Sequence, residues 1–244
     1  ISAAACLLTG ITATGALSLI AKANEAKSFI LSDFLVGRDA AAEGCTITEQ
    51  DGGFVVSKRG GDNHATTDIS AMQFTYQADL EVLEGPGNGV LAFGVSDREN
   101  PLSGSWYGVC ATRTGNPYPG ELRLFKVDNG LPVDEHIPMT EEQMAAKTNT
   151  IRITVDDQKV IKVYLDGELM IQYQDDSFQG GYVGICTNDS KVKFSNMSFQ
   201  EGPPAAEEPG DFRTNLKNLT PLNGVWSETS AGLQGKGTGD CIAM

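Results

Sequence analysis

A stretch between residues 97 and 123 holds the side chains of this chain that are best suited to contact a sugar. Sugar recognition needs flat apolar faces that stack on C–H groups and planar polar groups that pair with neighbouring hydroxyls. Charged and aromatic residues are interleaved here, and Trp106 is the only tryptophan before Trp226. The candidate binding residues are Asp97, Arg98, Trp106, Tyr107, Arg113, Tyr118, Glu121 and Arg123.

Strand alternation divides these residues between two faces. Side chains on a strand point alternately to opposite sides, so Tyr107 and Arg113 are expected on one side. The leucines at 122 and 124 are expected in the core, which turns Glu121 and Arg123 to the other face. Prolines on both sides of Tyr118 make a stiff loop that would hold this ring away from the sheet.

Structural roles remain open for several of the same residues. Trp106 or Tyr107 could belong to the core, because large aromatic side chains dominate protein interiors. Arg98 could be a solvated loop charge. Sequence alone does not decide between these interpretations.

The carboxylate pattern of a glycosidase is missing from the sequence. Such an enzyme needs two carboxylates on one face, flanking the bond to be cut. Glu49 and Asp51 come closest, but they run directly into two glycines and are expected to form a turn. Glu81 and Glu84 have the wrong parity to share a strand face. No catalytic residue is therefore predicted.

Other catalytic signatures are absent too. The sequence contains no G-x-S-x-G elbow, no P-loop and no dinucleotide fingerprint. Its two histidines, His64 and His136, are far apart in sequence, and both are expected on the surface or in loops. No organic cofactor is predicted.

The composition is that of an acidic globular protein. The chain has 244 residues, of which 40% are hydrophobic and 20% charged, and its net charge is −14. No cluster of Lys and Arg interrupts this acidity, so the chain should repel nucleic acid and anionic membranes. Neither is an expected partner.

The first residues have the composition of a secretory signal. Residues 1–20 are apolar and small, and Ala21-Lys22-Ala23 then fits a small-x-small cleavage site. We interpret residues 1–27 as a signal peptide whose basic n-region is missing. A membrane anchor is the alternative, but the length is marginal for a span of ~20 apolar residues. No second hydrophobic stretch follows, so no membrane insertion is expected after signal removal.

The cysteines do not form a metal-binding pattern. Cys6 lies in the presumed signal, and the other four are far apart with no CxxC. Cys110 and Cys186 lie in apolar strand patterns and are interpreted as buried thiols. A disulfide between them is the alternative in an oxidising compartment.

Short alternating or apolar runs separated by turn residues predict strands almost throughout. Residues 148–173 form the clearest case, with Asp166-Gly167 fitting a type I′ turn, which needs positive φ at both central residues. One short helix is expected at 140–147, with Thr140 as its N-cap. Many short strands at this spacing predict an all-β sandwich or barrel.

The end of the chain repeats its beginning. Asp211-Phe212 lies 178 positions after Asp33-Phe34, and Trp226 lies 179 positions after Ile47. A repeat of domain length indicates a modular array. The predicted organisation is a signal peptide at 1–27, a complete module at 28–199, a Pro/Glu-rich linker at 200–210 and the truncated start of a second copy at 211–244.

Four segments carry a recognisable order. A strand ending in Asp-Gly is followed by a Gly-x-Val-Gly-Ile strand and a closing Phe-x-Asn-x-x-Phe strand. This order resembles the concanavalin A-like, laminin-G-like jelly rolls of secreted bacterial carbohydrate-active proteins, and the resemblance covers roughly residues 30 to 199. It implies an all-β, two-sheet antiparallel jelly-roll sandwich. The segments are 149–155 (NTIRITV), 160–167 (VIKVYLDG), 180–187 (GGYVGICT) and 192–199 (VKFSNMSF).

Within that superfamily, the chain is most similar to carbohydrate-binding module family 66. Those modules accompany glycoside hydrolase family 32 fructan hydrolases, often in tandem and often after a signal peptide. The resemblance implies non-catalytic binding to chain ends of levan, inulin or a related fructan, in a secreted bacterial protein. It also implies a covalently linked catalytic domain beyond Met244. The Asp-Pro-Asn-Gly and Arg-Asp-Pro motifs of those hydrolases are absent from this sequence.

The resemblance leaves three points open. The fold often holds a structural Ca²⁺ through Asp carboxylates. Asp33, Asp156 and Asp157 are weak candidates for these ligands, and the alternative is that they form turns. A structural or adhesive laminin-G-like module is a second functional class. A glucanase-type hydrolase of the same fold is a third.

Overall fold

A computed structural model describes residues 26–57, 62–113, 119–128, 131–205, 225–229 and 232–236. The chain divides into two compact units, one ending at Pro204 and one beginning at Ala205. The predicted signal peptide up to residue 25, the candidate Tyr118 and residues 206–210 of the predicted linker lie outside the described residues. No described helix has the length and apolar character needed to cross a membrane.

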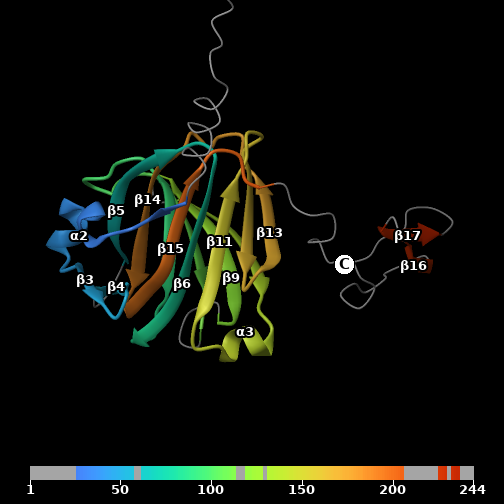
Figure 1. Cartoon of the computed structure of the whole chain (residues 1–244), viewed down its shortest axis with the longest axis horizontal. Coiled ribbons are helices and arrows are strands. Elements are labelled where there is room, and N and C mark those ends of the chain that lie inside the picture. The colour runs from blue at the N-terminus through green and yellow to red at the C-terminus, as the bar shows by residue number, and fades with distance from the viewer. Residues whose placement is uncertain are drawn as a thin grey trace, which may run out of the picture. The chain divides into compact units, whose positions relative to one another are not determined.

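The first unit is a sandwich of two antiparallel sheets, which confirms the predicted jelly-roll fold (Figure 1). Sheet A has the order β13-β12-β11-β6-β15-β4-β3, with β1 also paired to β15, and sheet B has the order β10-β9-β8-β7-β14-β5-β2. Sheet A consists of β1 (Lys27–Ser28), β3 (Thr46–Gln50), β4 (Gly53–Ser57), β6 (Phe74–Glu84), β11 (Asn149–Val155), β12 (Val160–Leu165), β13 (Glu168–Gln174) and β15 (Lys191–Glu201). Sheet B consists of β2 (Leu35–Val36), β5 (Asp62–Ala71), β7 (Gly89–Val95), β8 (Trp106–Ala111), β9 (Glu121–Asp128), β10 (Leu131–Pro138) and β14 (Gly181–Asn188).

Local sequence signals account for several of these elements. The β12–β13 hairpin turns at Asp166 and Gly167, whose φ angles of 51° and 87° are both positive, as the predicted turn requires. The helix α3 (Glu141–Ala145) begins after Thr140, whose side chain accepts a hydrogen bond from the backbone N–H of Gln143. Two further short helices, η1 (Leu31–Asp33) and α2 (Arg38–Ala42), lie near the start of the sandwich.

The main core lies between the sheets and follows strand alternation. On β6, Phe74, Tyr76, Ala78 and Leu80 are buried, while the residues between them are only partly so. Facing them from sheet B are Leu91, Phe93, Tyr107, Val109, Leu122, Leu124, Val183 and Ile185.

Two long strands were not predicted. Strand β5 is rich in polar residues, yet it lies inside sheet B between β14 and β2. Strand β10 begins and ends near prolines, which is allowed because it is an edge strand. The expected surface position of His64 is wrong, because β5 places this residue where it is fully buried.

The structure contradicts a Cys110–Cys186 disulfide. Strand β7 lies between β8 and β14, and Val90 is the direct partner of Cys186. Two strand spacings separate the Cα atoms by about 10 Å, whereas a disulfide needs less than about 7 Å. Both residues, like Cys45, are buried thiols.

In the second unit the structure describes one hairpin. Strands β16 (Val225–Thr229) and β17 (Gly232–Lys236) have the lengths and register of β3 and β4, shifted by 179 positions. The turn pair Thr229 and Gly232 corresponds to Gln50 and Gly53. The assignment of residues 211–244 to a second module stays a prediction.

Phe93 is the residue whose truncation tests the main core. Its ring is fully buried, 5.1 Å from that of Tyr107 and 5.9 Å from that of Phe74. We expect Phe93→Ala to lower the free energy of unfolding by about 3–5 kcal/mol in urea titrations. The control Met144→Ala removes a side chain that is 40% exposed and should cost less than about 0.5 kcal/mol. Equal losses in both variants would contradict this assignment of the core.

Candidate functional site

The outer face of sheet B carries a second apolar cluster. Alternation on β7 sends Leu91 and Phe93 into the main core and Val90 and Ala92 to the outer side, where Trp106 also lies. All seven residues of β7 are buried, so this strand is covered on both faces. In a sheet with one face exposed to solvent, the residues on that face are normally polar. The apolar outer face of sheet B therefore needs an explanation.

Small residues form the floor of this outer face. Gly184, Ala92 and Gly108 are neighbours in register across β14, β7 and β8. A methyl group added at Gly108 would lie 2.4 Å from the ring of Phe125, so this ring already covers the glycine. The row is thus a depression into which larger side chains fold.

Three rings lie over this floor. Trp106 contacts His64 edge-on, with ring centroids 4.2 Å apart, and contacts Phe125 in the same manner at 5.3 Å. His64 and Trp106 come from β5 and β8, which are three strand spacings, or about 14 Å, apart. The two side chains lean toward each other across the small residues, so their buried rings fill the space above this floor.

His64 is the least expected member of this group. Its side chain is fully buried, and neither ring nitrogen has a hydrogen-bond partner in the described part of the chain. Burial lowers its pKa to about 3, so the ring is neutral near pH 7. Buried polar groups are nearly always hydrogen-bonded, so an exception of this kind calls for an explanation.

A polar border runs along β9 and β10 beside the rings. Arg123 forms an ion pair with Asp134, and His136 Nδ1 lies 3.0 Å from Glu121 Oε2. The Arg123 guanidinium also lies 5.7 Å from the ring centroid of Phe125. These four side chains are between 16% and 46% exposed, so they are the accessible polar groups of the face.

The structure brings three of the eight predicted binding residues to this face. Trp106, Glu121 and Arg123 lie there, and the predicted outward direction of Glu121 and Arg123 is correct. Trp106 is only 2% exposed, so it packs beneath the face and is not open to a ligand. Sequence reasoning missed His64, Phe125, Asp134 and His136. Parity with Arg123 could have revealed Phe125, since the two residues are separated by one inward-facing leucine.

Four other predicted binding residues lie elsewhere. Tyr107 points into the main core, where its ring stacks on Phe93, and has no open face for a ligand. Arg113 donates to Asn149 Oδ1 at 2.8 Å near α3. Asp97 and Arg98 lie in the β7–β8 loop, where Asp97 accepts backbone hydrogen bonds and Arg98 donates to the Asp33 carbonyl.

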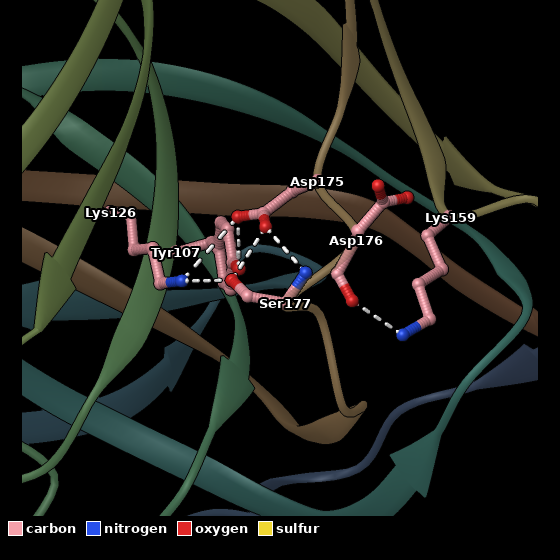
Figure 2. Close-up of polar contacts among 6 residues, drawn as sticks. All are labelled: Tyr107, Lys126, Lys159, Asp175, Asp176 and Ser177. Atoms are coloured by element: carbon pink, nitrogen blue, oxygen red, sulfur yellow. Dashed lines mark hydrogen bonds and ion pairs between the residues drawn. The ribbon is translucent and has the colours of Figure 1, made fainter.

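The hydroxyl of Tyr107 belongs to a polar cluster that joins sheet B to the β13–β14 connection (Figure 2). It donates to Asp175 Oδ2 at 2.7 Å, and Lys126 donates to Ser177 Oγ at 2.7 Å. Ser177 donates to the other carboxylate oxygen of Asp175, and Lys159 Nζ donates to the backbone carbonyl of Asp176. The cluster thus satisfies its own donors and acceptors.

Electrostatics in this cluster support a structural role. Burial would raise the pKa of Asp175, but hydrogen bonds from Ser177 and Tyr107 and the charge of Lys126 outweigh it and lower the pKa to about 2. The side chains of Asp175 and Lys126 are 12% and 15% exposed. A carboxylate held this firmly in its charged form is a weak proton acceptor and is unsuited to acid–base catalysis at neutral pH.

The three candidate calcium ligands do not come together. Asp33 accepts a hydrogen bond from the backbone of Ile30, and Asp156 Oδ1 accepts from the backbone of Gln158 and Val160. Asp157 occupies the same turn as Asp156. The described residues contain no group of three or more metal-binding side chains. Asp33 and Asp156 therefore act as turn formers.

Comparisons with known proteins establish the fold. No protein-family model and no curated protein matches the sequence. The carbohydrate-binding module CBM66 from Bacillus subtilis matches with a TM-score of 0.56 and 22% identity, over 69% of this chain and 96% of that one. A native glycosidic hydrolase matches with a TM-score of 0.52 and 9% identity, over 72% and 94%. The metal-free Emp46p carbohydrate recognition domain matches with a TM-score of 0.51 and 13% identity, over 71% and 90%.

His64 should make the protein sensitive to mild acid. Its folded pKa of about 3 lies below the ordinary value of 6.5, so the unfolded chain binds the proton more tightly. Stability should therefore fall by about 3–5 kcal/mol as the pH drops from 6.5 toward 3. His64→Phe should remove this loss, as measured by urea unfolding at a series of pH values. His136→Gln should keep it, and an unchanged acid slope in His64→Phe would contradict the assignment.

Asp175 should affect the stability of the protein at a lower pH than His64 does. Because its folded pKa is depressed, its contribution is present above about pH 4 and is lost as the pH falls toward 2. We expect Asp175→Asn to lower stability by about 2 kcal/mol at pH 7 and by almost nothing at pH 2. The neighbouring exposed carboxylate gives the control, since Asp176→Asn should cost less than about 0.5 kcal/mol. A pH-independent loss in Asp175→Asn would count against the charged cluster.

Proposed function

We propose that the sandwich is a non-catalytic carbohydrate-binding module that uses the outer face of sheet B. The observation that carries the proposal is the make-up of this face, where an aromatic cluster borders a strip of paired charges. Phe125 offers an apolar surface, and Arg123 with Asp134 offers planar groups that can bind neighbouring hydroxyls. The fold likeness to CBM66 and to the Emp46p carbohydrate recognition domain supports this use of the fold.

The carboxylates of the face favour binding over hydrolysis. A glycosidase needs one carboxyl group that is protonated and another that is free to attack or to activate water. On the described part of this face, Glu121 and Asp134 each contact a cationic or basic partner on the neighbouring strand. Such pairs suit hydrogen bonding to sugar hydroxyls.

The polysaccharide that we propose is a fructan, levan or inulin, bound at its chain ends. The resemblance of the chain to family 66 modules supports this choice, together with the fold shared with CBM66. In the same proposal the protein is secreted by a bacterium, and the module is joined to a catalytic domain of the fructan-hydrolase type. It would hold that domain on its polymer by raising the effective concentration.

Affinity electrophoresis of the full chain tests this function. We expect retardation in gels containing levan or inulin and none in gels containing β-glucan. Absence of retardation on every polysaccharide would refute carbohydrate binding and leave the adhesive class of module. Retardation by β-glucan alone, with release of sugar, would support the glucanase class.

A matched pair of variants tests the site. Arg123→Ala should weaken fructan binding about tenfold or more, because it removes a bidentate donor and leaves Asp134 without this partner. The control is Arg152→Ala on sheet A, where an arginine lies 3.8 Å over the ring of Tyr164. It removes the same kind of cation–π pair from the other sheet. Equal losses in the two variants would place the site elsewhere.

A further inference from the structure

A pocket lies at one end of the sandwich. Figure 1 shows α3 at the opposite end. It has a volume of about 450 Å³ and is formed by the β5–β6 turn, the start of β14 and the end of β15. This volume falls in the usual range for small-ligand sites, roughly 300–1,000 Å³. None of the predicted binding residues belongs to it.

Glycines shape this pocket. Gly180, Gly181 and Gly202 all line it, and their φ angles are 73°, 139° and 107°. These angles belong to the region that favours glycine. A methyl group at Gly180 would lie 2.8 Å from both the Ala71 carbonyl oxygen and the sulfur of Met72. The backbone therefore bounds the pocket closely, with no side chain from these three positions entering it.

Four hydrogen-bonding side chains in the lining are unengaged. Ser70, Gln73, Gln179 and Glu201 supply a hydroxyl, two amides and a carboxylate. None of these side chains forms a hydrogen bond or ion pair in the described part of the chain. Together they present both donors and acceptors toward one small volume.

The remaining lining narrows the class of ligand. Met72 is 45% exposed and provides an apolar surface beside the amides. Glu201 is the only charged residue of the lining, so an anion would meet no compensating cation. Neutral donors and acceptors next to an apolar wall suit a ligand with hydroxyls on one side and C–H groups on the other.

We infer that this pocket is a second saccharide-binding site, of the size of a mono- or disaccharide. The inference rests on the carbohydrate-binding function proposed above and adds a second point of attachment to it. In this site Gln73 and Gln179 bind sugar hydroxyls, and Met72 contacts the C–H face. Two sites on one module would raise the affinity for a polymer above that for a short sugar.

Nuclear magnetic resonance of the ¹⁵N-labelled full chain tests this inference. The probes are fructose, sucrose and glucose, added separately while the amide signals of Gly180, Gly181 and Gly202 are followed. We expect at least one sugar to shift these three signals. Gln73→Ala combined with Gln179→Ala should weaken this response roughly tenfold. Gln172→Ala, an exposed amide on sheet A, is the control and should leave it unchanged.

This experiment tests the two proposed sites separately. Arg123→Ala should weaken the shifts around β9 and β10 about tenfold or more and leave those at the glycines unchanged. Shifts on β9 and β10 with silent glycine signals would overturn the second site and keep the proposed function. Glycine shifts that persist at full strength in the double variant would also overturn it. If no amide responds to any of the three sugars and the polysaccharide gels show no retardation, both proposals are wrong.

Discussion

Burial of β7 on both of its faces is the constraint on which the rest of sheet B depends. One face closes the main core with Leu91 and Phe93, and the other must still cover Val90 and Ala92. Small residues in register with Ala92 make this possible, because they leave room for the rings of His64, Trp106 and Phe125. The apolar outer face and the burial of its histidine follow from this second layer of packing.

Much of the fold was predictable because its signals are local. Alternation in β11 and β12 and the Asp166-Gly167 turn fix a meander that the structure confirms. Strand β5 was not predictable in this way, since its polar residues take their places only when β14 pairs with it. The β-propensities of the residues predict a half-buried strand well, but they predict a central strand with buried polar groups poorly.

The candidate face was only partly predictable for the same reason. Parity placed Arg123 outward, and the structure agrees. Parity also put Tyr107 on the side opposite Trp106, but it could not say which of the two sides is the core. That choice depends on Phe178 and Asp175, which come from a connection more than sixty residues later and enclose the Tyr107 ring. Contacts between residues so far apart in the sequence cannot be predicted from the spacing of residues 97 to 123.

The position of β10 has a consequence for association between molecules. This strand forms one edge of sheet B and carries Asp134 and His136 of the candidate face. Unprotected edges recruit strands from other chains, and a proline cannot donate the backbone hydrogen bond that such pairing needs. Pro132 and Pro138 stand near the two ends of this edge. They oppose extension of the sheet by a neighbouring molecule and so keep the polar border at the margin of the sheet, even where modules are crowded on one polymer.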